Sequence, residues 1–97
     1  MYVRMVIGEA ISSAQIDELR SIFKDALKEI VETDGNLGAN FMVEEGGNMI
    51  IALTHWKTRE DCIKYHCSRS YRQFVAKTQH LLLGDFVVKL FKEYSRG

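Results

Sequence analysis

Three stretches of this chain are apolar at nearly every position, and they constrain its fold more than any other feature. They are residues 41–43 (FMV), 49–56 (MIIALTHW) and 86–91 (FVVKLF). An antiparallel strand with water on one side alternates apolar and polar residues, so near-continuous apolar strands indicate a sheet covered on both faces. The chain contains enough helix to cover one face only. We therefore expect the other face to pack on a second copy, in a homodimer with a barrel-like interface.

Size and charge exclude several classes of protein. The 97 residues suit one domain, residues 1–97, and the 13 basic and 13 acidic side chains give a formal net charge of zero. This balance lacks the positive footprint of a protein that binds nucleic acid or anionic lipid. No apolar run approaches the ~20 residues that span a membrane, and the first residues do not resemble a signal peptide. Cys62 and Cys67 would point in different directions on one helix, so we expect reduced thiols and a cytoplasmic protein.

Apolar periodicity and turn-forming residues predict an alternating order of strands and helices. In chain order, we expect a strand at 2–10, a helix from Ser12 or Ser13 to a stop at 34–36, strands at 37–44 and 48–56, a helix in two pieces (58–66, then from Ser68 to Gly84), and a strand at 85–94. This β-α-β-β-α-β order is the ferredoxin-like plan, an α+β fold with a four-stranded antiparallel sheet.

Short motifs support these boundaries. Ser12 with Gln15 is a capping-box pattern, and Thr58 with Asp61 is a second helix N-terminus. Gly35 suits the left-handed conformation that follows a helix. The segment 45–48 (EGGN) is typical of a hairpin turn.

Within this plan, residues 52–58 (ALTHWKT) followed by 68–74 (SRSYRQF) resemble a known family. The chain is similar to the antibiotic-biosynthesis-monooxygenase-like proteins of the dimeric α+β barrel superfamily. They carry a Trp at the end of the third strand, a Ser or Thr that opens the next helix, and a Ser-x-x-(Tyr/His)-x-x-Phe-like segment. Trp56 to Phe74 has this spacing.

The resemblance implies a homodimer whose two sheets face each other. It also implies a small-molecule pocket between sheet and helices in each subunit. Activities in the family include cofactor-independent oxygenation of aromatic polyketides and quinols, haem degradation, and isomerisation of small signalling molecules; some members have no known activity. A shared fold does not choose among these.

We expect neither haem nor a metal. The haem-degrading branch uses a helix histidine as iron ligand and an asparagine on the first strand, whereas this chain has Val75 at the ligand position and no Asn on that strand. Cys62 and His66 share a helical face, but a zinc site needs three or four ligands, and His55 and His80 are distant in sequence. The chain also contains no phosphate-binding loop or dinucleotide fingerprint, so we expect no cofactor.

The best catalytic candidates are His66 and Tyr65, on the short helix that roofs the pocket in the resembling proteins. A group that titrates near neutrality could transfer the proton of a phenolic substrate. The alternative is a surface histidine beside a partly buried tyrosine. Trp56 could stack on an aromatic substrate, or it could cap the core where strand meets helix.

Four further residues are candidates for binding. Asn40 is polar within an apolar strand, so it either enters a cavity or faces solvent at a sheet edge. Tyr71 and Arg72 could border the same pocket, although a plain surface charge is the favoured interpretation of Arg72. Arg4, among apolar residues of the first strand, could belong to the pocket or to an ion pair at the interface.

Two functions are compatible with these residues. The first is a cofactor-independent monooxygenase that acts on a small aromatic or quinol-like molecule. The second is a non-catalytic dimeric module that binds a small molecule or serves a stress response, so whether the protein is an enzyme stays open. RNA-recognition modules share the element order, but the third strand here has no basic residue or stacking pair, which argues against RNA.

Overall fold

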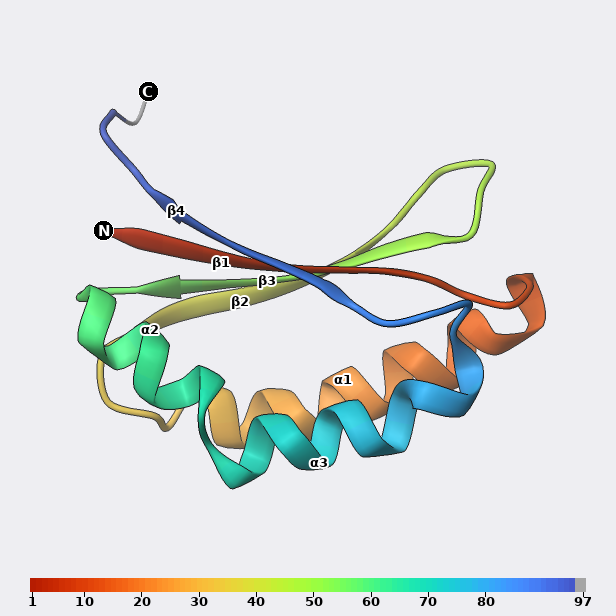
Figure 1. Cartoon of the computed structure of the whole chain (residues 1–97), viewed down its shortest axis with the longest axis horizontal. Helices are drawn as coiled ribbons and strands as arrows, with labels where there is room; N and C mark the ends of the chain where they lie inside the picture. The colour runs from red at the N-terminus through yellow and green to blue at the C-terminus, as the bar shows by residue number, and fades with distance from the viewer. Residues whose placement is uncertain (96–97) are drawn as a thin grey trace.

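The computed structural model describes residues 1–95 and confirms the ferredoxin-like α+β plan (Figure 1). The strands form an antiparallel sheet in the order β2-β3-β1-β4. The elements are β1 (Tyr2–Glu9), the 3₁₀ turn η1 (Ser13–Gln15), α1 (Ile16–Ile30), β2 (Asn36–Val43), β3 (Met49–Trp56), α2 (Arg59–His66), α3 (Arg69–Thr78), the 3₁₀ turn η2 (Gln79–Leu81) and β4 (Val87–Lys92).

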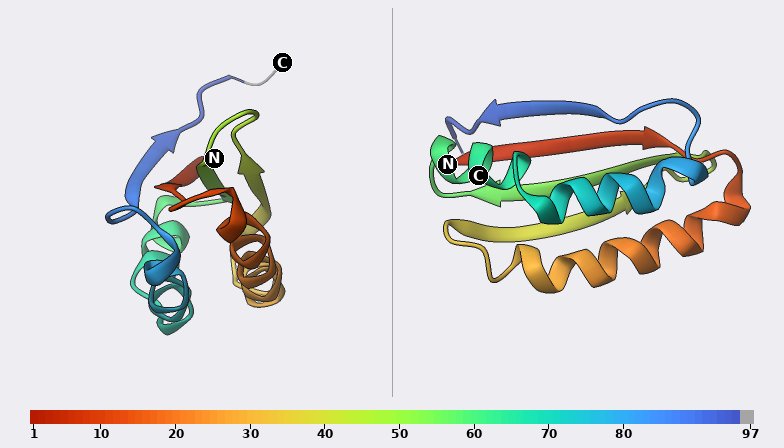
Figure 2. Two further views of the ribbon diagram at one scale, coloured as in Figure 1. Left: turned by 90° about the vertical axis from the view of Figure 1, so that its right-hand side faces the viewer. Right: turned by 60° about the horizontal axis from the view of Figure 1, so that its bottom comes forward.

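All the helices lie on one side of the sheet, as both views in Figure 2 show. The face of β3 toward them is fully apolar except for Thr54, and it is buried at every second residue from Ile50 to Trp56. Leu19, Phe23 and Ile30 of α1 are buried and form the helix side of the core. The apolar residues that recur every three or four positions in this segment therefore form the buried face of α1.

The opposite face of the sheet, here called the outer face, is also apolar, and in this single chain nothing covers it. It carries Ile51 and Leu53 of β3, which alternate with the buried residues and are partly exposed. Val87 and Phe91 of β4 are exposed on the same face, paired with Ile7 and Val3. Apolar residues on both faces explain the missing alternation in the sequence. Coverage of the outer face by a second copy remains a prediction.

Strand β4 is exposed along its whole length, on the helix side as well. Val88 and Leu90 face the helix side because they pair with Val6 and Arg4, yet they are 37% and 39% exposed. The helix layer does not reach across β4 (Figure 2, left). A groove is left between this strand and α2.

Two side-chain caps and one glycine place α2 under the end of β3. Thr58 accepts a hydrogen bond from the backbone N–H of Asp61 at 3.1 Å, as predicted, and Ser68 caps α3 through the N–H of Tyr71 at 3.2 Å. Gly35 has a φ of +81°, and its carbonyl accepts a hydrogen bond from Lys57 N–H at 2.8 Å. Helix α2 therefore begins at a fixed point and carries Tyr65 and His66 toward β1.

Candidate functional site

A chain of aromatic rings runs through the layer between sheet and helices. Trp56 is completely buried, donates from Nε1 to Thr54 Oγ1 at 2.8 Å, and stacks on Tyr65 with ring centroids 5.2 Å apart. The chain continues from Tyr65 to Tyr71 at 6.0 Å and from Tyr71 to Phe74 at 6.5 Å. These contacts fill the interior that the resemblance suggested as a pocket.

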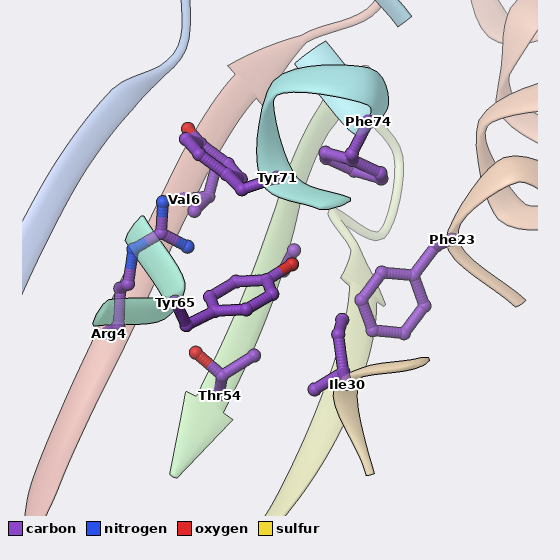
Figure 3. Close-up of a pocket in the computed structure, with 9 residues that line it drawn as sticks. Arg4, Val6, Phe23, Ile30, Thr54, Tyr65, Tyr71 and Phe74 are labelled. Atoms are coloured by element: carbon purple, nitrogen blue, oxygen red, sulfur yellow. The ribbon is translucent and has the colours of Figure 1, made fainter. Parts of the chain in front are cut away.

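Arg4 reaches into this aromatic layer from β1, as Figure 3 shows. Its side chain is 2% exposed, and the guanidinium carbon lies 4.0 Å from the ring centroid of Tyr71 and 5.4 Å from that of Tyr65. Its Nη2 lies 2.9 Å from Nδ1 of His66. A cation over aromatic faces is stabilised by the ring quadrupoles.

The Arg4–His66 hydrogen bond determines the protonation state of the imidazole. A guanidinium only donates, so Nδ1 of His66 must accept, and the proton of the neutral ring lies on Nε2. His66 is an exposed residue whose ring is partly desolvated against its neighbours; this desolvation first, and the charge of Arg4 second, lower the pKa of His66 below its usual value. His66 can accept a proton at Nδ1 only after Arg4 releases that nitrogen.

Tyr65 stays a neutral phenol at physiological pH. Burial raises its pKa to about 12, and the lowering by the nearby Arg4 is smaller than this effect. Tyr65 is therefore not a base in this site, and its ring provides a packing surface for Trp56 and Arg4.

The space available to a ligand lies outside the aromatic layer. The small cavity around Arg4, Tyr65 and Tyr71 has a volume of about 10 Å³, room for one water molecule. The groove between α2 and β4 has a volume of about 270 Å³ and is open to solvent. It is lined by Arg4, Cys62, Ile63, His66, Val88 and Leu90. A second hollow of about 210 Å³ lies beyond Tyr71, next to Val75 and Phe86.

The structure brings together only part of the predicted site. His66, Tyr65 and Tyr71 meet around Arg4. Trp56 lies behind Tyr65 and has no exposed surface with which to stack on a ligand. Arg72 is exposed and lines neither the groove nor the small cavity around Arg4.

Asn40 faces solvent at the edge of the sheet, which is one of the two environments predicted for it, and does not enter a cavity beside His66. It is an exposed residue of the edge strand β2, and it pairs with Leu53 on the outer face. The groove lies on the other side of the sheet, so Asn40 is separate from the His66 cluster.

Arg4 is the central residue of the cluster, although its sequence context left its role open. Alternation along β1 places Arg4 on the same face as the buried Val6, toward the helices. That periodicity was the available signal, and it favours the pocket over the outer face. The contact with His66, 62 residues away, has no local signal.

Other expectations concern metals, thiols and membranes. Within residues 1–95, no three His, Cys, Asp or Glu side chains are grouped as a metal site would require. Both cysteines are free, Cys62 buried and Cys67 exposed. In the same part of the chain, no helix has the length and apolar character needed to cross a bilayer.

Sequence comparison identifies the family. The model of the antibiotic biosynthesis monooxygenase domain matches residues 3–77. The chain belongs to the antibiotic biosynthesis monooxygenase family. Among curated proteins, no significant match is found.

Several solved structures share the fold. A monooxygenase from Streptomyces coelicolor, ActVA-Orf6 in complex with nanaomycin D, has a TM-score of 0.86 at 15% identity over 98% of this chain and 88% of its own. SnoaB, a cofactor-independent oxygenase from Streptomyces nogalater, has a TM-score of 0.80 at 14% identity, with 98% and 95% of the two chains covered. A Mycobacterium tuberculosis protein has a TM-score of 0.82 at 14% identity, with 99% and 98% covered.

Proposed function

We propose that this family member is a cofactor-independent monooxygenase of a small aromatic or quinol-like molecule, which binds in the groove between α2 and β4. The observation that carries the proposal is the hydrogen bond between Arg4 and His66 in the wall of that groove, with Tyr71 packed behind both side chains. The His66 ring, which packs on Tyr71 at 5.3 Å, lines the groove, so an aromatic ligand there would meet a titratable group beside apolar walls. The family and the oxygenase SnoaB support the same reaction class.

In this reaction the substrate itself supplies the electrons. An activated ring CH₂ loses a proton, and the resulting carbanion reduces O₂. One oxygen atom becomes a carbonyl on that carbon, and the second leaves as water with the two hydrogens. The protein binds the substrate, accepts its proton and keeps bulk water away.

His66 and Tyr65 have different roles in this scheme. When the developing oxyanion of the substrate draws Arg4 away, Nδ1 of His66 becomes free to take the proton. Tyr65, held neutral by burial, does not line the groove; it lies beside the guanidinium of Arg4 and supports it from the aromatic layer. Tyr71 packs against His66, Trp56 stacks on Tyr65 from the far side, and we assign Asn40 and Arg72 no role in this groove.

The remaining parts of the proposal concern the assembly and its location. The apolar outer face supports a homodimer formed sheet to sheet, with one groove in each subunit on the side away from the interface. Two free thiols are consistent with a reducing compartment, and we propose the cytoplasm.

Oxygen uptake tests the proposed reaction directly. With an anthrone or a quinol as substrate and EDTA present, the protein should consume O₂ faster than the uncatalysed reaction. His66→Gln should lower turnover by about 10²–10⁴-fold, the usual contribution of a general base. His80→Gln, at an exposed site outside the groove, should leave turnover unchanged. Absence of uptake above the background rate would favour the alternative, a non-catalytic binding module.

A further inference from the structure

We propose that Arg4 is an anion-binding subsite in the wall of the α2–β4 groove, which selects small molecules with a flat apolar body and one negatively charged oxygen. The inference concerns the site of the proposed function and deepens it. Binding of such an anion requires no turnover, so the two proposals can fail separately.

Arg4 carries a permanent buried charge. A guanidinium does not lose its proton in proteins, so this side chain, 2% exposed, remains a cation inside the protein. Burial of an uncompensated charge costs several kcal/mol, and such groups are ordinarily paired. No carboxylate lies within 4.0 Å of Arg4 among residues 1–95. By contrast, Arg20 on the surface reaches Asp17 at 3.4 Å.

The guanidinium of Arg4 also has too few acceptors. It has five N–H donors, but His66 Nδ1 is the one acceptor that it meets in the described part of the chain. Its Nε is buried and has no hydrogen-bond partner. The rings of Tyr65 and Tyr71 offset part of the cost of burial without supplying a negative charge. The protein keeps the guanidinium in place but leaves its charge uncompensated.

The lining of the groove supplies no negative charge either. Apart from Arg4 and His66, the lining consists of Cys62, Ile63, Val88 and Leu90, and none of these is acidic. Burial raises the pKa of the Cys62 thiol, so it stays protonated. An organic anion would meet one cation and apolar walls, in a medium where charge-assisted hydrogen bonds are strong. A phenolate, an enolate or an aromatic carboxylate has this chemistry.

A carboxylate from a second copy is the competing source of the missing charge. Arg4 faces the helices, whereas the proposed dimer interface is on the outer face of the sheet. The groove therefore points away from that interface and stays accessible.

Matched ligands test the subsite. We would measure binding of 2-naphthoate and of its neutral isostere 2-naphthamide by calorimetry at pH 7.5. The wild-type protein should prefer naphthoate by roughly 10- to 100-fold, the range for one hydrogen bond to a charged group. Equal affinities, or no binding of either ligand, would overturn the proposal. Inorganic phosphate should not compete at equal concentration; if it does, the groove does not select an apolar body.

Variants localise the effect. Arg4→Met should bring the two affinities within a few fold of each other, and Arg4→Lys should retain part of the preference. Because Arg4 is buried, a second pair avoids any folding defect at that site: Ile63→Glu adds a negative charge on the groove wall, and Ala76→Glu adds one on an exposed part of α3. Only Ile63→Glu should weaken naphthoate, by about tenfold. Equal effects of the two variants would contradict the location.

The oxygen-uptake assay separates the two proposals. If uptake occurs without any preference for naphthoate, the subsite is wrong and the reaction class stands. If the preference is found without uptake, Arg4 belongs to a binding module.

Discussion

The states of Arg4 and His66 depend on each other, because one hydrogen bond of 2.9 Å joins the buried guanidinium of Arg4 to the imidazole of His66, which lines the groove. While it lasts, the imidazole is held neutral and the guanidinium has one acceptor. A ligand oxyanion that takes the guanidinium would free the base. Binding of the substrate and activation of the base are thus coupled through one bond.

The lowered pKa of His66 has a consequence for stability. Partial desolvation and Arg4 place its folded pKa below the value of 6.5 that it has when unfolded, so the unfolded chain binds more protons between the two values. The contribution of neutral His66 is complete above about pH 6.5 and is lost as the pH falls through the folded pKa. Urea unfolding at pH 7.5 and 5.5, at equal protein concentration, should show a smaller loss for His66→Gln than for the wild type. Identical losses would contradict the pairing with Arg4.

Trp56 is expected to act through packing. Its side chain is completely buried, stacks on Tyr65 and satisfies Thr54. Trp56→Ala should lower the free energy of unfolding by roughly 3–5 kcal/mol, as other truncations of buried aromatic residues do. Tyr94→Ala, at a side chain that is 86% exposed, is the control and should change it by about 0.5 kcal/mol or less. Near-normal stability with lost ligand binding would make Trp56 a binding residue.

At the scale of elements, the position of α2 depends on a close approach between Gly35 and Asp61. A Cβ added to Gly35 would collide with the carboxylate of Asp61, which also accepts a hydrogen bond from Thr58 at 2.8 Å. Gly46 has a nearly equal φ, +77° against +81°, but open space around it. An alanine at Gly46 would therefore carry backbone strain alone, whereas an alanine at Gly35 would carry the same strain and a steric clash with Asp61.

Alanine at these two glycines tests the contact. Gly46→Ala should cost about 1–2 kcal/mol, the usual penalty for a left-handed alanine. Gly35→Ala should cost at least about 1 kcal/mol more, because Asp61 and the start of α2 must also shift. Thermal or urea unfolding measures both, and amide exchange of α2 should increase in Gly35→Ala only. Equal costs would show that α2 tolerates the displacement.

Most elements could be predicted because their signals are local. Thr58, Ser68 and the glycines of the β2–β3 hairpin act within a few residues of themselves. The helix boundaries were less accurate. Helix α1 ends at Ile30 rather than at 34–36, and the Thr33 hydroxyl instead donates to the carbonyl of Glu29 from a following turn. The last strand is Val87–Lys92 rather than 85–94, and its later start coincides with Phe86, which turns inward and stacks on Phe74 at 5.8 Å.

The candidate site was less predictable than the fold. Tyr65 and His66 are neighbours in sequence, so one predicted helix was enough to place them together. The link to Arg4 depends on how far α2 extends beneath β1, which is a property of the assembled layers. Asn40 illustrates the same limit, since an isolated polar residue in an apolar strand does not reveal which face of the sheet is closed.

At the scale of the whole molecule, the outer face predicts the oligomeric state. Val87 and Phe91 are 52% and 46% exposed there, and Ile51 and Leu53 are partly exposed two strands away. Lys89 of β4 interrupts this face, but most of it is apolar, and an exposed apolar face of this kind is typical of an interface. Light scattering at micromolar concentration should give about twice 11.2 kDa for the wild type. A monodisperse monomer would contradict the homodimer.

Ile51→Lys places a charge at the centre of the outer face and should give a folded monomer or a dimer weakened by at least about tenfold, because an unpaired charge buried in an interface is costly. Val31→Lys, at an exposed apolar residue directly after α1, makes the same change outside that face and should leave the dimer intact. Far-UV circular dichroism confirms that both variants keep their secondary structure. If Val31→Lys dissociates the dimer and Ile51→Lys does not, the two copies meet through their helices, and access to the α2–β4 groove must be reconsidered.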